Sequence, residues 1–197
     1  MPSLKQWRHF VFPKGVDVFL NSYKQGISNI VAKVNRNIAD TFNTNLISMR
    51  TSLVIQHLRD GKKIREDRVL DKKITNIFCD TIVKSLCGLS EYDNFKNFKY
   101  HQSGVGTNPE NSNDIDLQTP VGSRIIGTQE IGDVSNIYQS IAVITYFDNY
   151  SIAEHGLFNT QTGGILMDRT VFSPYSVIPN DSLRFIFTIG FTAGGGS

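Results

Sequence analysis

The sequence predicts a mainly β protein: an antiparallel, jelly-roll-like β-sandwich with an N-terminal amphipathic helix or arm and one additional helix. Two patterns predict it. Apolar residues recur at steps of three and four over residues 16–42, and short strand-like runs between turn residues follow from about residue 95. Hydrophobic residues make up 40% of the chain and charged residues 19%, which excludes disordered and collagen-like classes. We expect an arm over residues 1–45 and a sandwich domain over 46–197, with a flexible Gly-rich end at 194–197.

The predicted arm joins an aromatic segment to a long amphipathic helix. Aromatic side chains contribute most of the binding energy at many protein interfaces, so we expect this arm to contact a partner. The alternative, in which the aromatic residues fold back on their own domain, stays open at this point. The predicted interface residues are Trp7, Phe10, Phe12, Phe19, Tyr23, Ile27 and Ile30.

The next segment predicts a β-hairpin followed by a helix. Strand-like sequence over residues 46–58 and 62–74 flanks Asp60-Gly61, a dipeptide that favours a two-residue turn. The apolar spacing over 75–88 is helical, with Thr75 as the N-cap and Gly88 at the C-terminal end.

The remaining residues predict antiparallel strands. The strand-like runs are RIIGTQEI, IYQSIAVITYF, SIAEHGLFN, ILMDRTVFS and SLRFIFTIGFT. In IYQSIAVITYF, residues alternate between two faces. The last run places Leu183, Phe185, Phe187, Ile189 and Phe191 on one face, which must be covered. Such spacing is typical of a sandwich or jelly roll.

The stretch 151–172 contains polar residues that resemble a catalytic set. Neighbouring residues on a strand point to opposite faces, so Glu154 and His155 cannot act together directly. Gly163 and Gly164 supply the positive φ that a hairpin loop needs. Asp168 or Arg169 can pair with Glu154 or His155 across the sheet. We interpret these six residues as structural residues of a hairpin and expect no catalytic residue here.

The other residue types offer little chemistry. The histidines at 9, 57, 101 and 155 lack metal-ligand spacing, and Cys79 and Cys87 lie eight residues apart in a predicted helix, beyond disulfide reach. We therefore expect no metal, cofactor or disulfide. No apolar run is long enough to span a membrane, and the N-terminus lacks the pattern of a signal peptide.

Charge is distributed unevenly along the chain. Residues 1–73 contain 14 Lys/Arg and 6 Asp/Glu, whereas the remainder contains 6 and 12. A basic cluster around the predicted hairpin favours phosphate contacts, but interleaved acidic residues weaken it, so we do not expect a nucleic-acid partner. The cluster comprises Lys62, Lys63, Arg65, Arg68, Lys72 and Lys73.

Several sequence runs between Tyr100 and Gly194 resemble virion proteins of tailed bacteriophages. They are YHQSGVGT, RIIGTQE, IYQSIAVITYF, SIAEHGLFNTQTGGILMDRTVF and VIPNDSLRFIFTIGFTAGG. The preceding LRDGKKIREDRVLDKKITNIFCDTIVKSL is similar to the usual preface of such domains. A fainter similarity extends to tail-collar and fibre-base domains, and the N-terminal 45 residues fall outside the resemblance.

The resemblance implies a non-enzymatic structural protein of the virion, assembled in the host cytoplasm. The first interpretation is a capsid decoration or cement protein that binds the major capsid protein or other virion proteins, as a trimer or dimer. The alternative is a tail, connector or fibre-base component. A third interpretation, a carbohydrate-binding sandwich, rests on Tyr92, Tyr100 and Tyr150.

Overall fold

The described part of the chain is mainly β, with two antiparallel sheets and one helix. The computed structural model describes residues 47–70, 72–89 and 95–193, of which residues 48–192 belong to one compact unit. The predicted arm lies outside the described residues. The strands are β1 (Ile47–Arg59), β2 (Lys62–Leu70), β3 (Tyr100–Gly104), β4 (Pro120–Ile126), β5 (Thr128–Ile131), β6 (Ile137–Thr145), β7 (Tyr150–Phe158), β8 (Leu166–Val177) and β9 (Ser182–Ala193); helix α2 (Asn76–Leu86) lies between β2 and β3.

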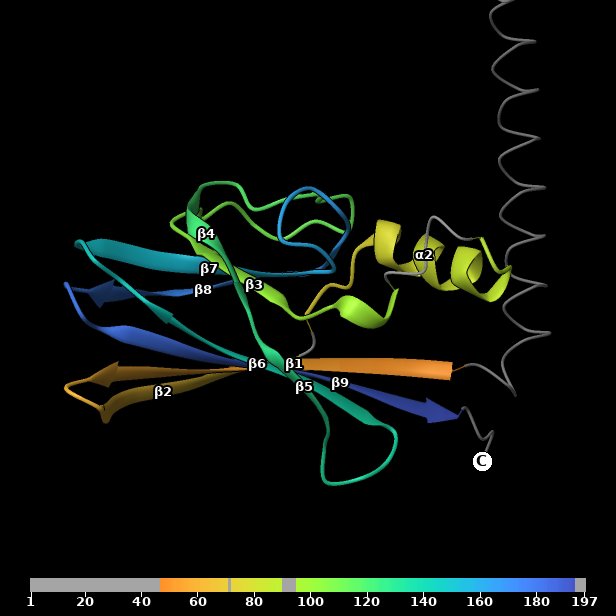
Figure 1. The fold of residues 1–197 in the computed structure, drawn as a ribbon, viewed down its shortest axis with the longest axis horizontal. Helices are drawn as coiled ribbons and strands as arrows, with labels where there is room; N and C mark the ends of the chain where they lie inside the picture. The colour runs from red at the N-terminus through yellow and green to blue at the C-terminus, as the bar shows by residue number, and fades with distance from the viewer. Residues whose placement is uncertain (1–46, 71, 90–94, 194–197) are drawn as a thin grey trace, which may run out of the picture. The chain divides into compact units, whose positions relative to one another are not determined.

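The two sheets lie in separate layers (Figure 1). The five-stranded sheet has the order β2-β1-β9-β6-β5, and the four-stranded sheet has the order β4-β3-β7-β8. The prediction of a mainly β, antiparallel domain is confirmed. The chain forms two consecutive strands in one sheet and then two in the other, as far as β8. These strand orders do not establish the jelly-roll-like connectivity.

The predicted hairpin forms between β1 and β2. Arg59 pairs with Lys62, and the two turn residues both have positive φ, 51° at Asp60 and 72° at Gly61. These angles match the turn type that suits the twist of a hairpin. The second strand ends at Leu70 instead of continuing to residue 74, because the chain leaves for the other sheet, where Ile74 bridges Asp168 of β8.

Helix α2 is confirmed together with its caps. The Thr75 side chain accepts a hydrogen bond from the Phe78 N–H (3.2 Å) and donates one to the Leu166 carbonyl, so the N-cap also fixes the helix to β8. Gly88 has φ 69° just after the helix, as a C-terminal glycine does. Phe78 is buried, whereas Leu86 on the predicted apolar face is 83% exposed.

The core lies between the sheets. The predicted inner face of β9 is confirmed, since Leu183, Phe185, Phe187 and Ile189 are all buried. The four-stranded sheet covers them with apolar side chains of its own, among them Ile152, Leu157, Met167, Tyr175 and Val177. One continuous apolar cluster therefore holds the two sheets together.

The run RIIGTQEI, expected to be one strand, is two strands in different sheets. β4 pairs with β3, whereas β5 pairs with β6. Gly127 lies at the crossing, where a Cβ atom would approach the Ile141 carbonyl oxygen to 2.5 Å, a separation that real Cβ atoms do not show. The backbone bends between the sheets at the one residue of the run that lacks a side chain.

Candidate functional site

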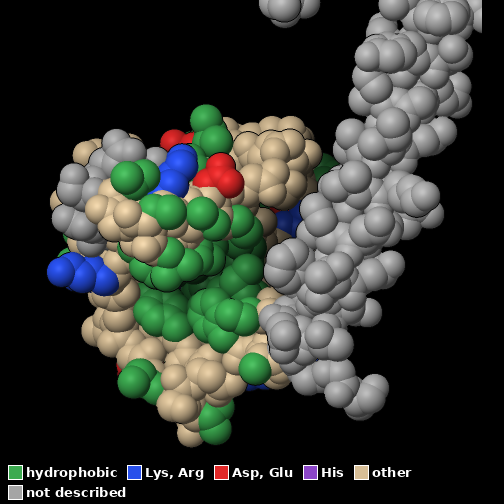
Figure 2. Space-filling model, turned by 90° about the vertical axis from the view of Figure 1, so that its right-hand side faces the viewer, with side chains coloured by type: hydrophobic (Ala, Val, Ile, Leu, Met, Phe, Trp, Pro, Cys, Tyr) green, Lys and Arg blue, Asp and Glu red, His purple; other side chains and the backbone are tan. Residues whose placement is uncertain are grey.

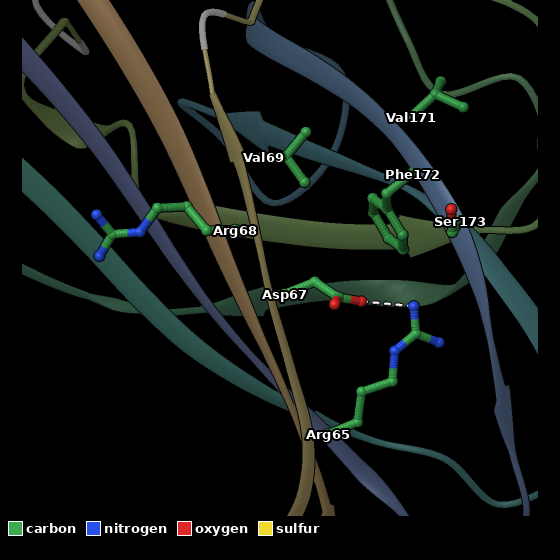
Figure 3. Close-up of a pocket in the computed structure, with 7 residues that line it drawn as sticks. All are labelled: Arg65, Asp67, Arg68, Val69, Val171, Phe172 and Ser173. Atoms are coloured by element: carbon green, nitrogen blue, oxygen red, sulfur yellow. Dashed lines mark ion pairs between the residues drawn. The ribbon is translucent and has the colours of Figure 1, made fainter.

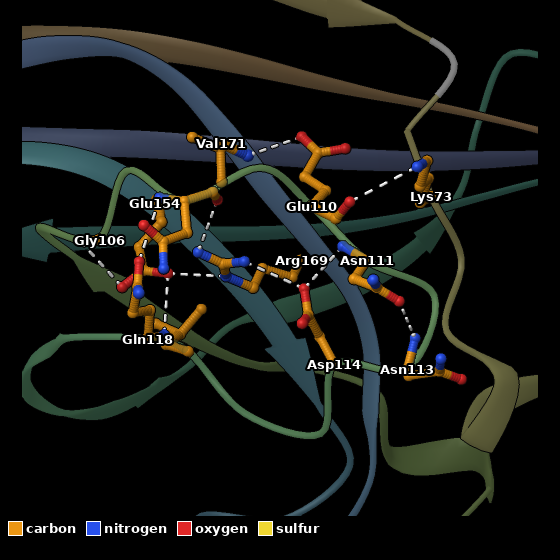
Figure 4. Close-up of polar contacts among 12 residues, drawn as sticks. Lys73, Gly106, Glu110, Asn111, Asn113, Asp114, Gln118, Glu154, Arg169 and Val171 are labelled. Carbon is orange, nitrogen blue, oxygen red and sulfur yellow. Dashed lines mark hydrogen bonds and ion pairs between the residues drawn. The ribbon is translucent and has the colours of Figure 1, made fainter.

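Glu154 occupies the centre of a buried polar cluster (Figure 4). Its side chain is inaccessible to solvent. Oε1 accepts hydrogen bonds from the backbone N–H groups of Gly106 (3.1 Å) and Thr119 (2.7 Å). Oε2 accepts from the Gln118 N–H (3.0 Å) and from Nε of Arg169 (2.8 Å). Every lone-pair direction of this carboxylate thus has a donor, which is the condition for burying a charge.

Arg169, on β8, connects Glu154 to the loop 105–119. Nη1 donates to Oδ2 of Asp114 (3.0 Å), and Nη2 donates to the Asn108 carbonyl (3.2 Å). Burial by itself lowers the pKa of Arg169, but hydrogen bonds to Glu154 and Asp114 outweigh burial and raise that pKa. Glu154 and Arg169 are the predicted cross-strand pair. We call the set formed by Glu154, Arg169 and Asp114, with Arg169 bonded to both acids, the loop clamp.

The loop clamp explains the two glycines of the SGVG run. A Cβ atom on Gly104 or on Gly106 would lie 2.5 Å from Oε1 of Glu154. Only a residue without a side chain lets the backbone come this close to the carboxylate. The sequence signal for this approach is a glycine at alternate positions, 104 and 106, next to the end of a strand.

A second ion pair fastens the same loop to the edge of β8. Nζ of Lys72 lies 3.0 Å from Oε1 of Glu110, and the same oxygen accepts a hydrogen bond from the Val171 N–H (2.7 Å). Figure 4 shows Glu110 above β8, apart from the loop clamp. Two separate contacts therefore hold the loop 105–119 on the four-stranded sheet.

The hairpin loop 159–164 is shaped by its glycines and by Arg124. Gly163 and Gly164 have φ of 59° and 78°, so the predicted positive φ is confirmed. Arg124 donates to the carbonyls of Thr160 (3.1 Å) and Gly163, while its guanidinium lies 3.3 Å from the centre of the Phe158 ring. Arg124, on β4, therefore holds this loop in place. This role was not predicted from the sequence.

His155 faces the core, on the other side of β7 from Glu154. Nε2 of His155 lies 2.9 Å from Nδ1 of His101, and Nε2 of His101 lies 2.8 Å from Oγ of Ser140. Burial lowers the pKa of His101 to about 3 and, together with the neighbouring His101, lowers the pKa of His155 well below its usual value. Sequence reasoning described the histidines as dispersed. The structure brings two of them together, because β3 and β7 pair across 54 residues.

Asp168 also faces the core, without a full set of partners. Oδ1 accepts a hydrogen bond from the Thr170 hydroxyl (2.6 Å), whereas Oδ2 has no partner among the described residues. Burial, with a smaller contribution from the nearby Glu110 carboxylate, raises the pKa of Asp168 to about 7. Asp168 therefore takes no part in the loop clamp, although it precedes Arg169 in sequence.

Two residues of the basic cluster, Arg65 and Arg68, line a groove between β2 and β8 (Figure 3). Arg65 forms an ion pair with Asp67 (2.5 Å), donates to the Pro174 carbonyl (3.0 Å) and covers the Tyr175 ring. Figure 3 shows Arg68 directed away from this pair. Elsewhere in the cluster, Lys63 pairs with Glu66 and Lys72 with Glu110. These contacts reduce the positive charge offered to a polyanion.

The tyrosines considered for carbohydrate binding do not gather in the described structure. Tyr92 lies outside the described residues. Tyr100 is half-buried against Leu117 and Phe158, whereas Tyr150 packs on the main core beside Tyr146, with ring centroids 6.2 Å apart. They belong to different apolar clusters and form no shared binding platform.

The predicted partner-interface residues Trp7 to Ile30 lie outside the described residues. Within the described ranges, no group of three or more His, Cys, Asp or Glu side chains is placed to hold a metal ion, and no helix is long and apolar enough to cross a membrane. Cys79 and Cys87 are both free and exposed. Comparison of the chain with protein-family models, with curated proteins and with solved structures gives no match. The resemblance to virion proteins stays a prediction.

Proposed function

We propose that this protein is a non-enzymatic structural component of a tailed-phage virion, a capsid decoration or cement protein with a jelly-roll-like body. One observation carries the proposal. The polar residues that could perform chemistry are buried and engaged in holding the fold: Glu154, His155 and Asp168 are inaccessible, and Arg169 is 3% exposed. A substrate cannot reach them. The contacts of Glu154 and Arg169 instead fasten the loop 105–119 to a sheet, as a rigid assembly subunit requires.

The proposed mechanism is mass action. A protein that binds an assembled shell but not its separated subunits stabilises the shell against opening. The arm over residues 1–45, with its predicted aromatic and apolar residues, would supply the contact with the major capsid protein or a neighbouring virion protein. The described sandwich would supply a stable body, present as a trimer or dimer. No step of this mechanism needs a cofactor or a metal.

Copy number tests the proposal. Quantitative mass spectrometry of purified particles that encode this chain would compare its amount with that of the major capsid protein. We expect a stoichiometric ratio, such as one copy per capsid subunit or one trimer at each local threefold axis. A small fixed number of copies per particle, in multiples of three or six, would overturn the decoration role and favour the tail, connector or fibre base. Absence from the particle would overturn the virion role altogether.

A further inference from the structure

An apolar pocket opens at the end of the sandwich next to α2, away from the loop clamp. Figure 2 faces this end and shows hydrophobic side chains gathered in a hollow. The pocket has a volume of about 380 Å³. Its described lining is Phe78, Phe95, Lys96, Phe98, Gln129, Tyr138, Met167, Ile189 and Phe191.

The floor of the pocket is the core itself. Phe78, Phe98, Met167 and Ile189 are each no more than 4% exposed. Phe95 forms part of the wall and is 36% exposed; its ring lies 5.9 Å from that of Phe78 and 6.0 Å from that of Phe98. A hydrocarbon that enters here leaves water and contacts close-packed aromatic and aliphatic side chains.

The polar groups inside the pocket already have partners. The Tyr138 hydroxyl donates to the Phe98 carbonyl, and Nε2 of Gln129 donates to the Tyr138 oxygen and to the Lys96 carbonyl (both 2.9 Å). A polar ligand would therefore lose its bonds to water without gaining new ones inside. This arrangement selects an apolar body.

One of the residues that line the pocket, Lys96, carries a positive charge. Lys96 is exposed, and its ammonium has no ion-pair partner among the described residues. An anionic group at the mouth would complement this charge and remain hydrated. The volume exceeds the space that one docked side chain needs and falls in the range of small-molecule sites, about 300–1,000 Å³.

We infer that this pocket binds a small amphipathic carboxylate, with its hydrocarbon body among the four phenylalanines and its carboxylate at Lys96. Such binding is independent of the virion role proposed above. The competing occupant is an aromatic side chain of a partner protein. If the pocket serves only that purpose, its affinity for free carboxylates should not rise with their chain length.

Isothermal titration calorimetry of the full chain with hexanoate, octanoate and decanoate tests the inference. Each buried methylene contributes about 0.8 kcal/mol, so we expect saturable binding at one equivalent per chain that tightens about fourfold per methylene until the pocket is full. Decylamine should bind more weakly than decanoate. Absence of saturable binding below the micelle concentration, or affinity that does not depend on chain length, would overturn the inference.

Two variants with matched controls locate the site. Phe95→Ala removes an aromatic wall and should weaken decanoate binding at least tenfold, whereas Phe147→Ala, at a residue that is 84% exposed and outside this pocket, should leave binding unchanged. Lys96→Gln should weaken decanoate binding about two- to fivefold without affecting decanol, and Lys62→Gln should affect neither. Equal effects in a variant and its control would exclude this pocket as the site. The Lys96 pair keeps the test valid if Phe95→Ala unfolds.

Discussion

The two faces of the four-stranded sheet differ in how they surround buried polar residues. On one face, four hydrogen-bond donors surround the side-chain oxygens of Glu154. On the other, His155 and Asp168 lack a complete set of partners, and burial shifts their pKa values toward the neutral form. The two faces therefore differ in the number of hydrogen-bond partners that each buried polar group receives.

The supply of donors differs because the two faces have different neighbours. The loop 105–119 brings backbone N–H groups to Glu154 that are not used in a strand ladder. Between the sheets, the backbone groups are already paired within the ladders, so only side chains such as Ser140 and Thr170 remain as partners. A loop can therefore solvate a charge that a second sheet cannot.

Removing the arginine that pairs with Glu154 should have the largest effect on stability. Arg169→Met leaves Glu154 and Asp114 without their cation, and removal of one partner from a buried ion pair destabilises a protein by about 3–5 kcal/mol. We expect a loss of this size in urea unfolding at pH 7. The matched control is Arg68→Met, which changes an exposed arginine and should stay within about 0.5 kcal/mol. Equal losses in the two variants would contradict the loop clamp.

Adding a side chain next to Glu154 should have the next largest effect on stability. Gly106→Ala places a Cβ atom against the Glu154 carboxylate, so the loop must move and hydrogen bonds must lengthen. We expect a loss of about 1–3 kcal/mol in the free energy of unfolding. Gly190→Ala is the control, because its nearest neighbour would lie at an ordinary 3.9 Å. A harmless Gly106→Ala would show that the close approach is not required.

Neutralising the other face should stabilise the protein. The pKa of Asp168 is raised to about 7 in the folded state, above its usual value of 3.8, so stability is lost as pH rises between these values. Asp168→Asn should remove this loss and raise the free energy of unfolding by about 1–2 kcal/mol at pH 8, with little change at pH 4. Unfolding curves at both pH values measure the difference. Asp133→Asn, on the surface, should show no gain at pH 8.

The histidine pair should produce the smallest effect, at acidic pH. The folded pKa of His155 is lowered, so the unfolded chain takes up protons first and stability falls as pH drops below about 6.5. His155→Phe keeps a ring against Phe185 and removes one such group. Between pH 6.5 and 5.5, the variant should lose about 1 kcal/mol less than the wild type. Parallel losses in the two proteins would contradict a neutral, buried His155.

Local features of the sequence predicted most of the fold but only part of the candidate site. The turn at Asp60-Gly61, the cap at Thr75 and the positive φ of Gly163 depend on a few neighbouring residues, and all three were predicted correctly. Strand geometry alone predicts that the side chains of Glu154 and His155 lie on opposite faces of the sheet. The structure confirms this placement. The three backbone donors around Glu154 could not be predicted, because they come from a polar loop without periodicity.

Within the described residues, the sequence by itself determined most of the strands, the helix, several turns, and which face of β9 is apolar, because each depends on residue type and short-range periodicity. Only the tertiary structure decided that Gly127 passes the chain between sheets, that His101 meets His155, and that Glu154 receives four hydrogen-bond donors while Asp168 receives one. These depend on pairing between segments far apart in sequence, and on the solvation that such pairing leaves to each buried group.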